Sequence, residues 1–372
     1  RTMSYSIHRL IAAMKQLDAS DLHIKVGLQP TYRVGGRLKH IEGDPLSEQE
    51  ADHLLDPIVP DTMRETFEVG GNLDFATHLP DGDRFRVNMF RSGGHTHAAI
   101  RRVKADIPSY KSLNLPQVYS DIVERSAEGL IIVCGVTGSG KSTTLAAMIE
   151  HVNQTRSANI ITIEDPVEFR FTPAKCIISQ REIGIDVKDF PTAMRYVVRQ
   201  DPDVIFIGEM RDRETLLSGI QAAETGHLVF ATLHTADTQQ AFGRILEFFP
   251  PEERDFIRNS LSSSLRAVCA QRLLPSVEGY ATPVVPATEV LRVTPPVKEL
   301  IRENRDSDLP QIVRSSKADG MRTFNDSLAE LVESEAVDMH TALEYSPNRE
   351  QLASQLKGVT IKASGLTGRV GR

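Results

Sequence analysis

The sequence predicts an α/β protein in which a parallel sheet follows a smaller α+β domain. Two observations indicate this class. Near-continuous apolar runs, separated by stretches of helical periodicity, are typical of a parallel sheet that is covered on both faces. Upstream of them, short segments in which polar and apolar residues alternate indicate antiparallel strands. With 372 residues, 40% of them apolar and 25% charged, the chain is long enough for two domains.

Residues 1–106 are expected to form the α+β domain. Apolar residues at helical spacing predict a helix near its start. Alternation predicts strands in DLHIKV and YRVGGRLKHI, and Gly35-Gly36 suits the turn of a hairpin. Ser47 and Glu50 have the spacing of a capping box, so a second helix is expected to begin there. NLDFATHL, RFRVNMF and THAAIRRV predict further antiparallel strands.

The rest of the chain is expected to form the parallel-sheet domain. Residues 107–118, which include two prolines, are a candidate linker. The apolar runs GLIIVCGV, NIITIED, DVIFIGEM and HLVFATLH are expected to be the strands of a core over residues 119–274. Residues 275–350 have a mostly helical pattern, and residues 351–372 are expected to be a flexible tail. Core helices are expected near residues 142–153, 190–200, 212–224 and 237–248.

Composition argues against several classes of function. The formal net charge of −7 and the pI of about 5.9 argue against a dedicated nucleic-acid binder. Cys134, Cys176 and Cys269 lie far apart without a CxxC pair, which argues against a zinc knuckle and a disulfide framework and fits a reducing cytosol. No apolar run reaches the roughly 18 residues that a membrane-spanning helix needs. Any membrane contact is therefore expected to go through partner proteins.

A phosphate-binding motif follows the first apolar run. GVTGSGKS, Gly135–Ser142, fits G-x-x-x-x-G-K-[ST] between a predicted strand and a predicted helix, which is the context that this motif requires. Its glycines let backbone N–H groups surround phosphates at a helix amino terminus. Lys141 is expected to neutralise phosphate charge on ATP, and Ser142 to bind Mg²⁺. The expected nucleotide-binding residues are Gly135, Thr137, Gly138, Ser139, Gly140, Lys141, Ser142 and Thr143.

Two acidic clusters come at the ends of later predicted strands. In IITIEDPVEF a proline ends the strand and leaves Glu164, Asp165 and Glu168 in the following loop. In DVIFIGEMRD, Glu209 has the place of a Walker B acid, and Gly208 stands where many P-loop ATPases carry Asp. Because the carboxyl ends of parallel strands share one edge with the phosphate loop, both clusters are expected near the same nucleotide. Helix caps or surface charges are the alternative explanation for such acids.

The segment TGHLVFATLHT, residues 225–235, carries His227 and His234 at the two ends of the fourth apolar run. Seven steps along a strand separate the two Cα atoms by roughly 23 Å and point the side chains to opposite faces, so one metal ion cannot bind both. His234 is expected at the edge of the phosphate loop, where it could contact the γ-phosphate or transmit the presence of this phosphate to a neighbouring domain. His227 is expected at the other edge, and geometry alone leaves a structural and a functional role equally open.

Taken together, the motifs of this sequence resemble those of a known family, the secretion ATPases of type II and type IV machines. Within this family they resemble the PilT-type pilus retraction ATPases. The resemblance covers most of the chain, through ASDLHIKVGLQPTYRVGGRL, GVTGSGKSTTLAAMI, TIEDPVEF, RQDPDVIFIGEMRD and AAETGHLVFATLHT. It implies a PAS-like amino-terminal domain, a RecA-like ATPase domain and a homohexameric ring.

The resemblance also implies roles for single residues. TIEDPVEF matches the family's aspartate box, and its catalytic glutamate, the candidate base that orients water, falls on Glu168. GEMRD matches the Walker B box, which makes Glu209 the acid on the Mg²⁺ side. TGHLVFATLHT matches the histidine box, which carries both His227 and His234.

Arginines of the family's amino-terminal domain serve as fingers that neutralise phosphate charge. RFRVN and AIRRV match that region, so Arg86 and Arg101 are the expected fingers, with Arg84 and Arg102 as neighbouring alternatives. The three scattered cysteines cannot supply the four-cysteine zinc element usual in pilus-extension and type II secretion ATPases, which favours the retraction branch. His95, in a place where many relatives have arginine, leaves a PilU-like member of the branch open.

The implied function is a hexameric motor that hydrolyses Mg²⁺-ATP to power type IV pilus retraction and twitching motility. Implied partners are an inner-membrane pilus platform protein and a paralogous motor ATPase, without nucleic acid. The implied location is the cytoplasm, at the inner membrane through the pilus machine. The alternatives are a PilU-like accessory or nucleotide-gated regulatory ATPase of the same machine and, against the acidic net charge, a DNA-translocating secretion ATPase.

Overall fold

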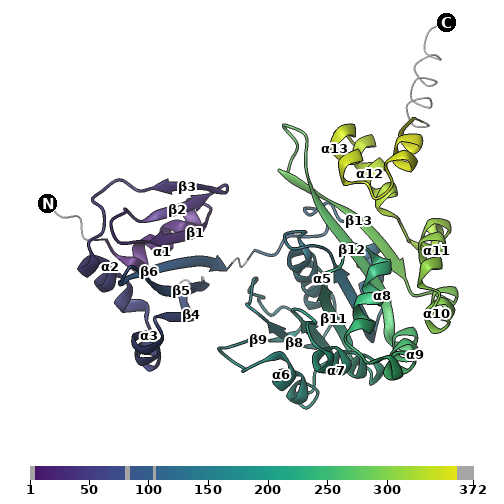
Figure 1. Ribbon diagram of the computed structural model, residues 1–372, viewed down its shortest axis with the longest axis horizontal. Coiled ribbons are helices and arrows are strands. Elements are labelled where there is room, and N and C mark those ends of the chain that lie inside the picture. Colours follow the sequence, from purple (N-terminus) through teal and green to yellow (C-terminus); the bar gives the residue numbers. More distant parts are fainter. Residues whose placement is uncertain (1–4, 80–83, 104–105, 358–372) are drawn as a thin grey trace, which may run out of the picture. The chain divides into compact units, whose positions relative to one another are not determined.

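The structure is a computed structural model that describes residues 5–79, 84–103 and 106–357. The chain divides into two units (Figure 1). The first unit comprises Arg1–Asp106 together with Glu168–Arg170, and the second comprises Ile107–Val167 and Phe171–Arg372. Each unit has its own buried apolar core.

The first unit is built on an antiparallel sheet. Its elements are α1 (Ile7–Gln16), β1 (Ala19–Ile24), β2 (Thr31–Val34), β3 (Arg37–His40), α2 (Glu48–Leu55), α3 (Arg64–Gly70), β4 (Asn72–His78), β5 (Arg84–Ser92) and β6 (His95–Val103). The six described strands have the order β3-β2-β1-β6-β5-β4. The alternation seen in the sequence explains the packing of the sheet, since every second residue of β5 from Phe85 to Met89 is buried while its neighbours are half-exposed.

Local signals in this unit act as predicted. Gly35 and Gly36 have φ of 55° and 76° in the hairpin between β2 and β3, a conformation that favours glycine. Ser47 and Glu50 form both hydrogen bonds of the capping box at the start of α2.

The second unit contains the parallel sheet. Its elements are α4 (Val118–Arg125), β7 (Gly129–Cys134), α5 (Lys141–Thr155), β8 (Asn159–Glu164), β9 (Ile177–Glu182), α6 (Phe190–Val197), β10 (Val204–Ile207), α7 (Arg213–Glu224), β11 (Leu228–Leu233), α8 (Thr238–Glu247), α9 (Arg254–Ser264), β12 (Leu265–Pro275), β13 (Val284–Arg292), α10 (Pro295–Arg302), α11 (Leu309–Ser315), α12 (Phe324–Glu333) and α13 (Met339–Tyr345). Within the described residues, the sheet has the order β13-β12-β7-β11-β10-β8-β9.

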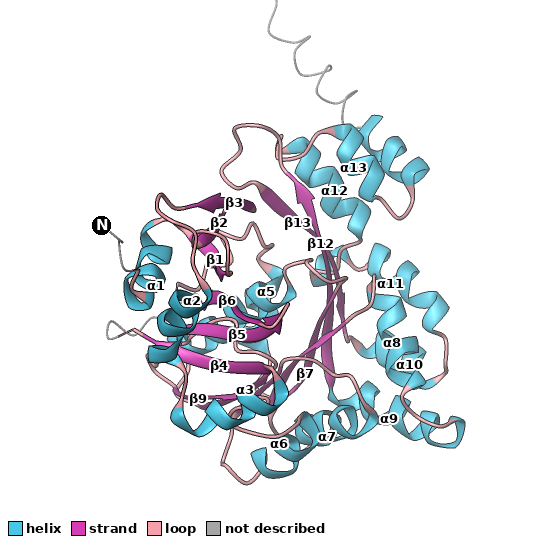
Figure 2. Cartoon of the chain, turned by 60° about the vertical axis from the view of Figure 1, so that its left-hand side comes forward, coloured by secondary structure: helices cyan, strands magenta, loops and turns pink. Residues whose placement is uncertain are grey.

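This order places the candidate site at one edge. The strands from β12 to β9 pair in parallel, and β13 pairs with β12 antiparallel. Every residue of β7, β10 and β11 is buried. Helices cover both faces of the sheet, since α5 lies on one side and α8 on the other (Figure 2), and α7 packs against β7 and β11. The carboxyl ends of β7, β8, β10 and β11 therefore lie at the same edge. The predicted α/β class is confirmed.

The end of the chain contains two features that the sequence did not indicate. Within residues 275–350, whose pattern is mostly helical, Val284–Arg292 forms the strand β13, which pairs with β12. Residues 351–357 are not a tail but continue a helix that starts at residue 349, and Leu352 and Leu356 are buried in the core. The rest of the expected tail, residues 358–372, lies outside the described residues.

Candidate nucleotide site

The phosphate loop connects β7 to α5, as its motif requires. Gly135, Gly138 and Gly140 have φ of 156°, 80° and 85°. A Cβ atom at Gly135 would lie 2.3 Å from the Ser139 Oγ and 2.5 Å from the Gln271 carbonyl oxygen. The backbone conformation and the close contacts therefore both require glycine at the start of this loop.

The interior of the loop fits a phosphate group. The buried Lys141 donates hydrogen bonds from Nζ to the carbonyl oxygens of Gly135 (2.8 Å) and Val136 (3.1 Å). The first N–H groups of α5 have no acceptor within the helix and form a site of positive potential. Ser139 is 2% exposed, and within the described part of the chain its Oγ has no hydrogen-bond partner. A ligand with several acceptor oxygens fits this set of donors.

The remaining motif residues lie where the sequence places them. Thr137 and Gly138 are exposed in the loop, and Ser142 and Thr143 are half-buried in the first turn of α5. The Ser142 hydroxyl is the ligand that a phosphate-bound Mg²⁺ would require at this position.

Glu209 follows β10 and faces two basic side chains. Its Oε2 lies 2.6 Å from Arg211 Nη2, and its Oε1 lies 3.4 Å from His234 Nε2. Burial acts to raise the pKa of Glu209, but the hydrogen bond from Arg211 and the charges of His234, Arg211 and Lys141 more than offset it. The pKa of Glu209 is therefore below its usual value, and the carboxylate is ionised.

The aspartate box after β8 divides into a buried and an exposed part. Glu164 is buried and accepts hydrogen bonds from Thr162 Oγ1 (2.6 Å) and Gln180 Nε2 (3.2 Å). Asp165 lies 3.7 Å from Arg211 Nη1, so Arg211 joins this box to Glu209. Glu168 is exposed, and its side chain has no hydrogen bond or ion pair with another residue of the described ranges.

The two histidines lie at opposite ends of β11. His234 follows the strand at its carboxyl end, beside Glu209. His227 precedes the strand, and its Nδ1 lies 2.9 Å from the Ala222 carbonyl oxygen in the last turn of α7. The same carbonyl oxygen also accepts hydrogen bonds from the backbone N–H groups of Thr225 and His227, at 3.2 Å each. His227 therefore takes part in the turn that closes α7, which is a structural role.

The predicted arginine fingers belong to the first unit and pair within it. Arg86 and Arg101 are opposite each other on β5 and β6. Arg101 Nε donates to Asp21 Oδ1 at 2.8 Å, and Arg86 lies 3.7 Å from Asp74. The Arg101 side chain is still 72% exposed, so this pairing leaves it accessible.

Two residues of the site have no counterpart among the sequence predictions. Arg211 connects Asp165 to Glu209. Its position in GEMRD does not by itself indicate these ion pairs. Gln271 on β12 contacts the phosphate loop from a position 132 residues after it. No local pattern in the sequence indicates such a contact.

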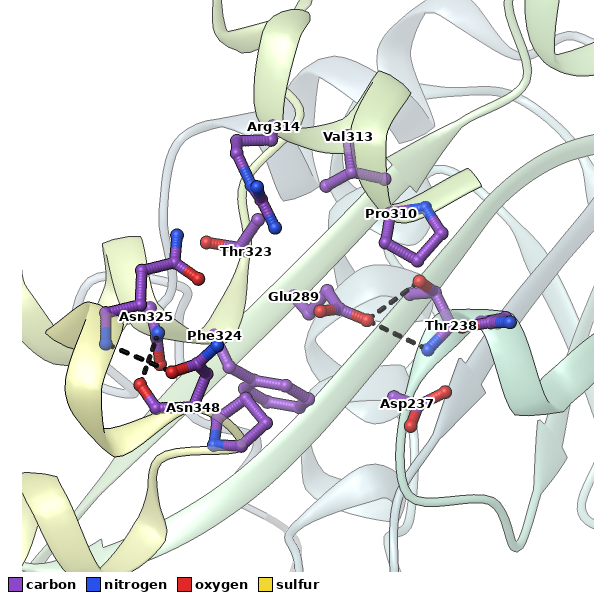
Figure 3. Close-up of a pocket in the computed structure, with 13 residues that line it drawn as sticks. Asp237, Thr238, Glu289, Pro310, Val313, Arg314, Thr323, Phe324, Asn325 and Asn348 are labelled. Atoms are coloured by element: carbon purple, nitrogen blue, oxygen red, sulfur yellow. Dashed lines mark hydrogen bonds between the residues drawn. The ribbon is translucent and has the colours of Figure 1, made fainter. Parts of the chain in front are cut away.

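A separate pocket of about 220 Å³ lies beside the amino end of α8 (Figure 3). Glu289 of β13 accepts hydrogen bonds there from the backbone N–H of Thr238 (3.0 Å) and from its Oγ1 (2.8 Å). None of the predicted nucleotide-binding residues lines this pocket. It is not the candidate nucleotide site.

Comparison with known proteins gives the family. Residues 7–337 match the family of the type II/IV secretion system protein. The chain belongs to this family. It is 38% identical over 338 residues to the type IV pilus retractation ATPase PilT of Pseudomonas aeruginosa, an alignment that covers 91% of this chain and 97% of the relative. It is 35% identical over 349 residues to the type IV pilus ATPase PilU of the same organism, covering 94% of this chain and 91% of the relative.

Solved structures of the family give the same result for the fold. The crystal structure of the pilus retraction motor PilT with bound ADP has a TM-score of 0.86 and 39% identity to this chain, covering 94% of this chain and 99% of that one. The predictions of the family, of its α/β ATPase fold and of an ATPase are confirmed. Within the described ranges, the helices of the chain are too short or too polar to cross a membrane.

Proposed function

We propose that the chain is a motor that hydrolyses ATP to retract a type IV pilus. The observation that carries this proposal is the convergence of the phosphate loop, Glu209 and His234 at one sheet edge in a chain that aligns with pilus retraction ATPases over nine tenths of its length. Family membership supports the ATPase activity, and the similarity to PilT supports retraction rather than extension of the pilus.

The residues of the site suggest a division of labour. Lys141 and the loop N–H groups bind the phosphates of ATP and fix their position. Ser142 and Glu209 would hold Mg²⁺, which would neutralise negative charge on the phosphates of ATP. Glu168 is proposed to orient the attacking water. Its side chain is exposed and makes no hydrogen bond to another described residue.

The histidines and arginines have supporting roles in this proposal. His234 holds Glu209 beside the γ-phosphate position, and His227 acts indirectly by fixing the turn between α7 and β11. Arg86 and Arg101 supply the finger charge that stabilises the transition state.

The working form is proposed to be a homohexamer at the cytoplasmic side of the inner membrane. Its proposed partners are a pilus platform protein in that membrane and a paralogous motor ATPase. We expect no nucleic-acid partner, because the net charge of −7 does not favour one. Stimulation of ATP turnover by DNA in a salt-dependent manner would contradict this expectation.

Two variants test the proposed site in the purified protein. Lys141→Ala should lose both ATP binding and turnover, because the phosphate loop loses its buried cation. Glu168→Gln should lose turnover by about 100-fold or more while it still binds ATP. Steady-state phosphate release measures turnover, and the shift of the melting temperature by ADP measures nucleotide binding. Undiminished turnover in both variants would refute the site.

Cells carrying the same variants test the direction of work. A strain that lacks the chain should keep surface pili but lose twitching motility, since pili would extend without being withdrawn. The wild-type chain should restore motility, and Lys141→Ala should not. Loss of surface pili in the deletion strain would instead identify an extension motor.

An accessory motor is the second candidate, because 94% of the chain aligns with the ATPase PilU. An accessory subunit would turn over ATP slowly alone and faster after addition of the paralogous motor. Turnover by the purified chain alone that equals turnover of the mixture would exclude this role.

A further inference from the structure

We propose that Gln271 of β12 is a positioning residue that holds the phosphate loop in its nucleotide-binding shape. The proposal rests on the nucleotide site described above, but not on the direction of pilus movement. Gln271 is 3% exposed and lies outside the motifs that make up the candidate site.

The side-chain amide of Gln271 connects the phosphate loop to helix α5. Its Nε2 donates to the Ser139 carbonyl oxygen at 2.8 Å, and its Oε1 accepts from Thr144 Oγ1 at 2.8 Å. Ser139 and Thr144 are 2% and 1% exposed, so water does not compete for these two bonds. One buried amide thus fixes the loop relative to the helix that carries the phosphate-binding N–H groups.

The glycines at both ends of the motif are also fitted to Gln271. A Cβ atom at Gly140 would lie 2.8 Å from Gln271 Nε2, and a Cβ atom at Gly135 would lie 2.5 Å from the Gln271 carbonyl oxygen. The loop therefore packs against Gln271 at both of its ends. These glycines are needed for this contact as well as for the approach of phosphate.

The role of Gln271 can be inferred from the effect of removing its side-chain amide. The Ser139 carbonyl would be buried without this donor, which is unfavourable and would be relieved by a shift of the loop. A shift would misalign the N–H groups that surround the phosphates. Because these groups act in binding rather than in orienting water, the main effect should be on nucleotide affinity and on KM, with a smaller effect on kcat.

Three substitutions separate the two bonds. Gln271→Leu removes both, Gln271→Glu keeps an acceptor for Thr144 but removes the donor to Ser139, and Thr144→Val removes only the bond to α5. The matched control is Thr288→Val. Thr288 is directly opposite Gln271 on β13 and 1% exposed, and in the described part of the chain its Oγ1 has no hydrogen-bond partner.

The measurements are KM for ATP, kcat and the rise in melting temperature that ADP produces. We expect Gln271→Leu and Gln271→Glu to raise KM about tenfold or more and to reduce the ADP-induced rise, with kcat within about threefold of wild type. Thr144→Val should give a smaller change in the same direction, and Thr288→Val none. Folded Gln271 variants with wild-type KM and a wild-type response to ADP would refute the proposal.

Two further outcomes keep this test separate from the test of the site. A merely structural Gln271 would lower the melting temperature without nucleotide and leave the ADP-induced rise unchanged, which would also refute the positioning role. If Lys141→Ala kept full ADP affinity, the nucleotide site itself would be wrong. In that case altered KM in the Gln271 variants could not be assigned to the loop, and the proposal would fall with the site.

Discussion

The carboxylate of Glu209 is fixed by two different side chains, one on each oxygen. Arg211 lies at 2.6 Å and His234 at 3.4 Å. The pKa of Glu209 is held below its usual value, so the carboxylate is ionised. The same contacts decide which way the carboxylate faces. In the proposed mechanism, His234 therefore acts on catalysis through the orientation of Glu209.

The two histidines should respond differently to substitution. Because His234 orients the carboxylate of Glu209 in the proposed mechanism, His234→Ala should lower kcat by about 10- to 100-fold, with little change in melting temperature. His227→Ala removes a hydrogen bond at the end of α7 and should cost about 1 kcal/mol of stability, with kcat close to wild type. Melting curves and steady-state turnover distinguish the two effects. A large fall in kcat for a stably folded His227→Ala would show that its role is catalytic.

Gly208, which occupies the usual place of a Walker B Asp, has a steric reason to be glycine. A Cβ atom there would lie 3.1 Å from the Ile163 carbonyl oxygen and 3.2 Å from the Glu164 Cα, both of which are backbone atoms of β8. Gly208→Asp should therefore not improve Mg²⁺ binding. It should destabilise the protein by about 1–3 kcal/mol, the usual cost of overpacking, and lower turnover because β8 and β10 would be pushed apart.

Gly243→Ala is the matched control for this prediction. Gly243 lies inside α8, and a Cβ atom there would have no neighbour within 4 Å. Alanine should stabilise this helix by about 0.5–1 kcal/mol. Chemical denaturation of both variants checks the pair, and a Gly208→Asp protein as stable as wild type would contradict the steric explanation.

At the scale of elements, the sequence predicts what is encoded locally. The phosphate loop, the strand ends that carry Glu164 and Glu209, and the α2 capping box each depend on a few adjacent residues. Strand β13 and the helix at residues 349–357 depend on partners instead, since β13 is defined by its pairing with β12 and Leu352 is buried only in the folded core. The contact of Gln271 with Ser139 spans 132 residues and has no local pattern.

The amino end of α8 is held by the half-buried carboxyl group of Glu289, which should make this element sensitive to pH. Burial raises the pKa of Glu289 above its usual value, although hydrogen bonds from Thr238 act in the opposite direction. The folded protein therefore binds a proton at Glu289 more tightly than the unfolded chain does. This contribution to stability is complete below the unfolded pKa of roughly 4.3 and is lost as the pH rises through the folded value.

We therefore expect Glu289→Gln to become more stable relative to wild type as the pH rises from about 4.5 toward neutrality. Glutamine keeps an oxygen for the two bonds from Thr238 and carries no charge. Chemical denaturation across this pH range measures the difference. Glu333→Gln, which removes a carboxylate from an exposed position, is the control for net charge and should give a constant difference. A constant difference for Glu289→Gln as well would contradict the prediction.

At the scale of the whole molecule, the proposal of a motor requires that subunits act together. The same site residues can occur in an ATPase whose subunits hydrolyse ATP independently and in a ring whose subunits hydrolyse ATP one after another. Mixing active and inactive subunits distinguishes them, because each arrangement predicts a different dependence of activity on composition.

Wild-type chain and Lys141→Ala should therefore be mixed, allowed to exchange subunits, and assayed for phosphate release. Independent subunits would give activity proportional to the wild-type fraction. If one inactive subunit stops a ring of six, a one-to-one mixture should retain only about 2% of the wild-type activity. Because each subunit must pass its conformational change to the next in a sequential motor, we expect a fall much steeper than proportional. Mixtures with Gly243→Ala, whose active site is intact, should lose no activity, and a proportional decline with Lys141→Ala would contradict coupled action in the ring.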